Sequence, residues 1–124
     1  MKLFILLLMI FLHIWDDFGR QGIMASMKQR SWWLKQDEFH PMYMQDYIVA
    51  LFMHSFSWAF MIMLPIFFLC MFEVTGMHLA YFICNLFIHM IVDDAKANAK
   101  CINLITDQTI HICQIALTWM VFVM

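Results

Sequence analysis

Four long apolar segments, separated by three polar connections, organise this chain of 124 residues. The second segment is long enough to cross the ~30 Å hydrocarbon core of a bilayer, and the first and third lie near the lower limit of about 17 residues. We therefore expect an all-α fold, a polytopic membrane bundle of about four transmembrane helices in a single domain covering residues 1–124. The predicted helices are residues 2–18, 47–72, 78–94 and 103–124.

The first connection, Gly19–Asp46, combines four cationic residues with the pair Trp32-Trp33. Tryptophan beside cations is typical of the headgroup region, so residues 22–35 are predicted to form an interfacial helix lying on the membrane. A solvated loop is the alternative. His40, which precedes a proline in this connection, is predicted to be a surface residue.

Lys2 and the short apolar run after it resemble a signal peptide. No small-x-small cleavage site follows, and Asp16 and Asp17 stand where one should be. We expect this segment to remain as the first helix.

The composition narrows the class of protein. Apolar residues make up 65% of the chain and charged residues only 13%, which excludes an ordinary soluble protein. A net charge of −2 gives no electrostatic basis for nucleic-acid binding. The four cysteines have neither C-x-x-C nor zinc-finger spacing, so a disulfide framework is not expected.

The cations predict an orientation in the membrane. Six of the seven Lys and Arg residues lie in the first and third connections, and the second connection has none. The positive-inside rule therefore places the first and third connections in the cytoplasm of a bacterial inner membrane and both termini in the periplasm. Four short helices bury little area, which favours a homo-oligomer, but no small-xxx-small face supports one.

Seven ionisable side chains interrupt the apolar segments, and in this topology all of them fall near the cytoplasmic side. Those on the same helix are spaced three or four residues apart and share a face, which must point inward because lipid cannot satisfy it. The stripes predict one interior polar cluster. Its members are His13, Asp17, His54, His89, Asp93, Asp107 and His111.

Imidazole and carboxylate groups are the ligands of Zn²⁺, Mn²⁺ and non-haem iron, so the cluster predicts a divalent metal site, most simply for Zn²⁺ or Mn²⁺. A hydrolase acting on a phosphorylated lipid or nucleotide fits such a site. The predicted ligands are His13, Asp17, His89, Asp93, Asp107 and His111. Asp17 or His54 is the candidate general base, and Gln21, Lys28, Lys96 and Gln108 are candidates for orienting an anionic substrate. Asp16 and Asp94 lie off the stripes and are predicted to face water or headgroups.

Three other functions fit the same stripes. The cluster can be a proton or ion path, although its periplasmic half offers little beyond Asn85, Gln114 and Thr118. The chain can also be a non-enzymatic module that binds another membrane protein, as in phage superinfection exclusion or interference with host defence. Finally, His–Asp pairs can simply hold a structural bundle together.

The motifs also resemble those of an uncharacterised family of small integral membrane proteins from bacteria and phages, a domain of unknown function. Here they read His13…Asp17-Phe18…Gln21, a following Lys28, a mid-chain His54, His89…Asp93…Lys96 and Asp107-Gln108…His111. Gly19-Arg20 departs from the apolar residues usual there. The resemblance implies a polytopic inner-membrane protein and supplies no activity. A more distant similarity, to proteins described as membrane-bound metal-dependent hydrolases, implies intramembrane His and Asp ligands.

Overall fold

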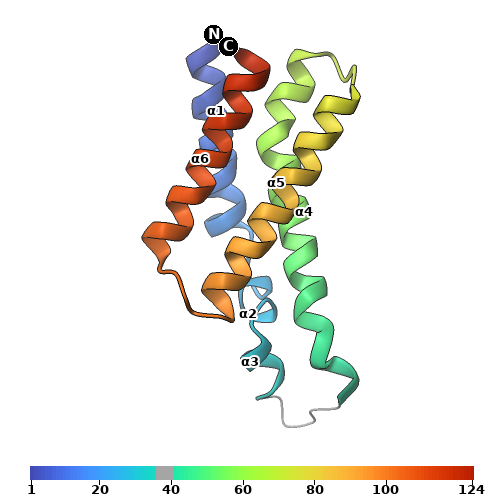
Figure 1. The fold of residues 1–124 in the computed structure, drawn as a ribbon, viewed down its shortest axis with the longest axis vertical. Coiled ribbons are helices and arrows are strands. Elements are labelled where there is room, and N and C mark those ends of the chain that lie inside the picture. The colour runs from blue at the N-terminus through green and yellow to red at the C-terminus, as the bar shows by residue number, and fades with distance from the viewer. Residues whose placement is uncertain (36–40) are drawn as a thin grey trace.

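The computed structural model describes residues 1–35 and 41–124 and confirms that the chain is all-helical in this part. The prediction for His40 lies outside the described residues. Figure 1 shows four long helices and, between the first two of them, short helical turns. In chain order the elements are α1 (Lys2–Ile14), a π-helical turn (Trp15–Gly19), α2 (Met24–Met27), α3 (Arg30–Trp33), a 3₁₀ turn (Pro41–Gln45), α4 (Asp46–Leu69), α5 (Gly76–Ala97) and α6 (Leu104–Val123).

The long helices pack into one bundle. Helix α4 packs against α1 and α5, and α6 packs against the same two helices on their other side. Both termini and the α4–α5 turn lie at one end of the bundle, and the first and third connections lie together at the opposite end (Figure 1). The connections that carry the cations therefore share one end of the molecule.

Two helices of the described part are long and apolar enough to cross a membrane by length and composition, Pro41–Leu69 and Gly76–Ala97. The sequence predicts about four. Helix α1 has only 13 residues of α-helix, about 20 Å at 1.5 Å per residue. Helix α6 has 20 residues but carries Asp107, Gln108, His111 and Gln114, which lower its hydropathy.

Large apolar side chains are exposed on the surface of the bundle, and part of its interior is polar. Large apolar side chains cover the outer faces of all four long helices, Phe4, Phe56, Ile91 and Ile105 among them. The interior divides into two regions along the bundle. The half toward the termini is filled by an apolar core of Ile5, Met9, Trp58, Ala59, Ile62, Met63, Ile66, Phe67, Leu86 and Ile115. The half toward the first and third connections is polar.

A π-helical turn at the end of α1 changes which side chains point inward. A π turn accommodates an extra residue, so it shifts the register of the side chains that follow it. Over Trp15–Gly19 this buries two consecutive carboxylates, Asp16 and Asp17. The prediction that Asp16 faces water or headgroups is wrong, because it assumed uninterrupted α-helical spacing; this side chain is only 3% exposed. Asp94 is half-buried.

The first connection folds over the end of the polar half. Where the sequence predicts one helix over residues 22–35, α2 and α3 form two four-residue helices, with Gln29 extended between them. The side chain of Asn98, at the end of α5, donates to the Lys28 carbonyl and accepts from the Arg30 amide. These two hydrogen bonds fasten the connection to α5 and turn Lys28 inward, where it is 5% exposed.

Candidate metal site

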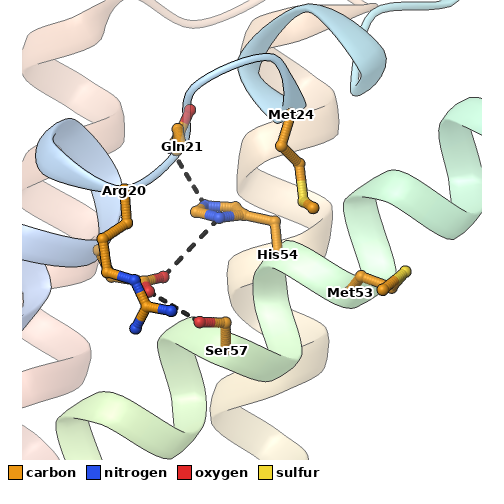
Figure 2. Close-up of a pocket in the computed structure, with 7 residues that line it drawn as sticks. Arg20, Gln21, Met24, Met53, His54 and Ser57 are labelled. Carbon is orange, nitrogen blue, oxygen red and sulfur yellow. Dashed lines mark hydrogen bonds and ion pairs between the residues drawn. The ribbon is translucent and has the colours of Figure 1, made fainter.

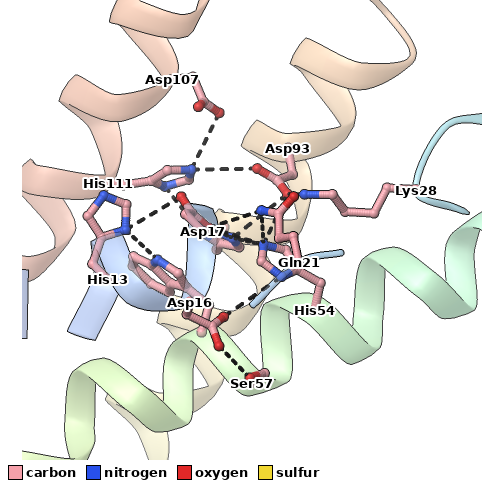
Figure 3. Close-up of polar contacts among 12 residues, drawn as sticks. His13, Asp16, Asp17, Gln21, Lys28, His54, Ser57, Asp93, Asp107 and His111 are labelled. Atoms are coloured by element: carbon pink, nitrogen blue, oxygen red, sulfur yellow. Dashed lines mark hydrogen bonds and ion pairs between the residues drawn. The ribbon is translucent and has the colours of Figure 1, made fainter. Parts of the chain in front are cut away.

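The seven ionisable residues predicted to gather do gather. They converge from α1, the π turn, α4, α5 and α6 on one region of the bundle, and each is less than 9% exposed (Figure 3). We call this region the polar cluster and include the buried Asp16 and Lys28. Its members are His13, Asp16, Asp17, Lys28, His54, His89, Asp93, Asp107 and His111.

At the centre of the polar cluster, two imidazole nitrogens lie close to each other and to two carboxylate oxygens. We call these four atoms the ligand quartet: Asp17 Oδ1, His54 Nε2, His89 Nε2 and Asp93 Oδ2. His54 Nε2 lies 3.1 Å from the Asp17 oxygen, 3.2 Å from His89 Nε2 and 3.5 Å from the Asp93 oxygen. His89 Nε2 lies 3.8 Å from each of the two carboxylate oxygens. A tetrahedral ion with bonds of 2.0–2.1 Å keeps its ligands about 3.3 Å apart, so these separations suit Zn²⁺ or a similar ion.

His54 Nε2 faces more polar atoms than one ring nitrogen can bond. The Gln21 amide nitrogen and His89 Nε2 each lie 3.2 Å away, and the Asp17 oxygen lies 3.1 Å away. One ring nitrogen makes one in-plane hydrogen bond, as donor or as acceptor, so these contacts cannot all be full hydrogen bonds. A cation among these atoms would bind the imidazole lone pairs and the carboxylate oxygens together.

His54 and His13 have different surroundings in the polar cluster. His54, predicted as a general base, lies in the quartet. His13, predicted as a ligand, has both ring nitrogens engaged: Trp58 Nε1 donates to Nδ1 at 2.7 Å, and Nε2 faces Gln108 Oε1 at 3.0 Å. The Gln108 amide in turn donates to Asp17 Oδ2 at 3.3 Å. His13 therefore supports the quartet from its edge.

The two predicted substrate-orienting lysines pair with carboxylates of the cluster. Lys28 Nζ lies 2.5 Å from Asp93 Oδ2, the oxygen that belongs to the quartet. Lys96 Nζ lies 2.5 Å from Asp107 Oδ2. In the described chain no Lys or Arg pairs with Asp16 or Asp17. The cluster and the adjoining Lys96 thus hold four carboxylates and two ammonium groups, so full compensation of the buried negative charge requires protonated imidazoles or a further cation.

Two groups of side chains have the spacing of a metal site, each with ligand atoms within 4.8 Å of one another. The first is Asp17, His54 and His89, and the second is His89, Asp93 and His111. Asp107 stands next to the second group, with Oδ1 3.4 Å from His111 Nε2. Of the six predicted ligands, four belong to these groups, and His13 and Asp107 flank them.

Sequence reasoning missed three residues around the site. Trp58 stacks on the His89 ring at 4.1 Å between centroids and closes the cluster toward the apolar core. Ser57 donates to Asp16 Oδ1 at 2.7 Å, and Asp16 Oδ2 lies 3.8 Å from His54 Nδ1. Trp58 could have been found, because it lies four residues after His54 on the same face of α4. The π turn that buries Asp16 left no signal in the spacing.

Two cavities reach the polar cluster from outside. One, of about 230 Å³, is lined by Asp16, Arg20, Gln21, His54 and Ser57 with Met24 and Met53 (Figure 2). The other, of about 450 Å³, opens beside Asp93 and is lined by three lysines. These are Lys28, Lys96 and Lys100, with Gln21, Gln29, Ala25 and Ala97 completing the wall. The quartet is therefore buried but borders space that a small anion can enter.

Comparisons with known proteins supply no relative. No protein-family model, curated protein or solved structure matches this chain.

Proposed function

We propose that this chain is an integral membrane protein that binds a divalent cation at the ligand quartet and hydrolyses a phosphorylated substrate. The observation that carries the proposal is the quartet itself. Two imidazole nitrogens, from α4 and α5, lie 3.2 Å apart, and each lies 3.1–3.8 Å from the same two carboxylate oxygens, of the π turn and α5. Zn²⁺ and Mn²⁺ both accept this mixed ligand set, whereas Mg²⁺ seldom takes imidazole.

The bilayer placement rests on the inverted distribution of side chains. Apolar side chains cover the outer faces of the long helices, and polar groups are collected inside, where a helix bundle in lipid must keep them. In this proposal α1 and α6 also cross the membrane, beside α4 and α5. Polar residues at the ends of α1 and α6 reach the membrane surface and so compensate for the short length of these two helices. The cation-rich end faces the cytoplasm by the positive-inside rule.

The lysine-lined cavity suggests the substrate class. Lys28, Lys96 and Lys100 line a space that borders Asp93 of the quartet. Ammonium groups bind phosphate as point charges, and a phosphate ester carries about two negative charges at pH 7. A phosphorylated lipid headgroup or a nucleotide fits this cavity because the cavity lies where the chain would meet the membrane surface.

The residues around the quartet have distinct parts in the proposed reaction. A bound divalent ion would supply Lewis acidity and water of lowered pKa at the site. Lys28 and Lys96 bind the phosphate oxygens, and the Gln21 amide orients the group at the junction of the two cavities. Trp58 closes the apolar side of the site against water. The hydrogen bonds from Asn98 keep Lys28 over the quartet.

Conduction of protons or ions has less support. The polar interior continues from His111 through Gln114 and Asn85 to Thr118. This polar chain runs beside the apolar core, and the residues of the core nearest the termini, Ile5, Ile66 and Phe67, are apolar. A path must cross both leaflets, and this one ends partway.

The test is metal analysis combined with phosphate release. Protein purified in mild detergent should retain a divalent metal, and His89→Ala should abolish its retention, because His89 belongs to both ligand groups. His78→Ala is the matched control, since it changes a histidine of the same helix α5 at the opposite end of the molecule. The metal-loaded protein should release phosphate from phosphatidate vesicles or from nucleoside monophosphates. Metal retention that His89→Ala leaves unchanged would contradict the site, and metal binding without phosphate release from either substrate would contradict the reaction.

A further inference from the structure

Two buried polar atoms beside the quartet have no hydrogen-bond partner among the described residues: His111 Nε2 and Asp107 Oδ1. Both side chains are fully buried, and the two atoms lie 3.4 Å apart. On the other side of the same nitrogen, Asp93 Oδ1 lies 3.7 Å away (Figure 3). An imidazole nitrogen thus sits between two carboxylate oxygens outside the ligand quartet.

Neighbouring hydrogen bonds determine what His111 Nε2 presents. The Gln114 amide nitrogen donates to the backbone carbonyl and the side-chain oxygen of Asn85, at 3.2 and 3.3 Å, which fixes the orientation of the amide. Gln114 Oε1 therefore faces His111 Nδ1, 3.1 Å away, and accepts the proton of that nitrogen. His89 Nδ1 lies 3.2 Å from the same nitrogen, so the two rings must move apart when both Nε2 atoms bind a cation. In the neutral His111 ring, Nε2 then carries the lone pair. A histidine whose other nitrogen is held in this way is typical of a metal ligand.

Asp107 and Asp93 each direct a carboxylate oxygen toward the His111 imidazole. Lys96 pairs with Asp107 Oδ2 and leaves Oδ1 facing the imidazole. Asp93 places Oδ2 in the quartet and Oδ1 toward His111. A bridging carboxylate gives one oxygen to each of two metal ions, and Asp93 has this arrangement. Helical bundles hold paired metal ions with such carboxylates.

We infer that the polar cluster holds two divalent cations, with Asp93 bridging them. The first position is the ligand quartet, and the second is formed by Asp93 Oδ1, His111 Nε2 and Asp107 Oδ1. This inference rests on the proposed function, because it adds a second ion to the same site. His89 adjoins the second position, because it forms with Asp93 and His111 a group whose ligand atoms lie within 4.8 Å of one another.

The charges suit two ions together with a phosphorylated substrate. The four carboxylates and two ammonium groups of the region leave two negative charges when the imidazoles are neutral. Two divalent ions reverse this to two positive charges. A phosphate ester with about two negative charges restores neutrality, and paired metal ions are a recurrent device for phosphoryl chemistry.

The number of bound ions tests the inference. Detergent-solubilised protein is stripped with a chelator, dialysed to equilibrium against Mn²⁺ and analysed for metal per chain. We expect about two ions in the wild-type protein and in His78→Ala, and about one in Asp107→Asn, which removes a ligand of the second position and no atom of the quartet. Electron paramagnetic resonance of the wild-type protein should show exchange-coupled Mn²⁺, a readout that does not depend on any variant folding.

The outcomes separate the two claims. One ion per wild-type chain at saturation, with an uncoupled Mn²⁺ spectrum, overturns the second position and leaves the proposed function standing. In that case His111 is a doubly protonated imidazole that donates to Asp107. Equal metal content in Asp107→Asn and wild type also overturns it. No bound ion at all overturns both proposals.

Discussion

The same four long helices bury apolar side chains in one half of the bundle and ionisable side chains in the other. Toward the termini, Met9, Trp58, Ile62 and Ile115 pack into a fully buried apolar core. Toward the first and third connections, the same helices bury ionisable groups, of which Asp93 and His111 are at most 1% exposed. The apolar half gains stability from packing alone, whereas the polar half gathers charge that needs compensation. On the proposed function, the polar half binds the cation and the apolar half holds its helices in place.

The largest expected effect comes from removing the bridging carboxylate. Asp93→Asn leaves the buried Lys28 ammonium without its partner, which should cost ~3–5 kcal/mol of metal-free stability. It should also weaken metal binding by more than ~100-fold, since even supporting residues typically cost 10–100-fold. Chemical denaturation and metal titration measure these effects. Asp94→Asn changes the neighbouring, half-buried carboxylate and should leave metal affinity unchanged; a similar loss in both variants would refute the assignment.

A change in the apolar half should separate stability from metal binding. Ile62→Ala removes a fully buried side chain and should cost ~2–5 kcal/mol through lost burial and the cavity left behind. Metal affinity, measured by titration well below the melting temperature, should stay within about twofold of wild type. A strong loss of affinity would show that the two halves are not independent.

Asp16 offers a test at the edge of the site. Its Oδ2 has no hydrogen-bond partner among the described residues and lies 3.8 Å from Nδ1 of His54, whose Nε2 faces the quartet. A carboxylate behind a metal-binding imidazole orients the ring and raises its basicity. Asp16→Asn should therefore weaken metal binding by ~10–100-fold, with stability in the absence of metal little changed. Unaltered metal affinity would mean that Asp16 does not orient His54 and only accepts the hydrogen bond from Ser57.

The smallest expected effect is a gain in metal affinity. Lys28 Nζ donates a hydrogen bond to Asp93 Oδ2, so its ammonium competes with a metal ion for that oxygen. Lys28→Met should tighten metal binding by a few fold and weaken inhibition by inorganic phosphate, because the phosphate-binding cavity loses a cation. Metal titration and phosphate competition measure the two changes. Weaker metal binding in this variant would show that Lys28 supports the cation site instead of competing with it.

Helical spacing accounts for most of what could be predicted. His89 and Asp93 on α5, and Asp107 and His111 on α6, are four residues apart, so their helices need only pack with those faces inward. Convergence at one end followed from the up-and-down order of the long segments. The all-helical fold and the gathering of the seven ionisable residues were within reach of such reasoning.

The remaining features depend on local geometry that spacing does not encode. The π turn at Trp15–Gly19 buries Asp16, and the extended Gln29 divides the predicted interfacial helix and directs Lys28 inward. Trp58 and Gln108 engage both nitrogens of the His13 ring, partners that the spacing of His13 does not indicate. Hydrogen-bond partners on other helices decide such roles, and a periodic pattern does not reveal them.

The central claim is that the polar half holds a cation through imidazole and carboxylate ligands. X-ray absorption at the zinc edge of Zn²⁺-loaded protein tests it most directly, because the chain also has four free cysteines that can bind zinc adventitiously. The account predicts nitrogen and oxygen ligands near 2.0–2.1 Å with imidazole scattering, lost in His89→Ala. A sulfur shell near 2.3 Å, or the same spectrum from His89→Ala, would contradict it.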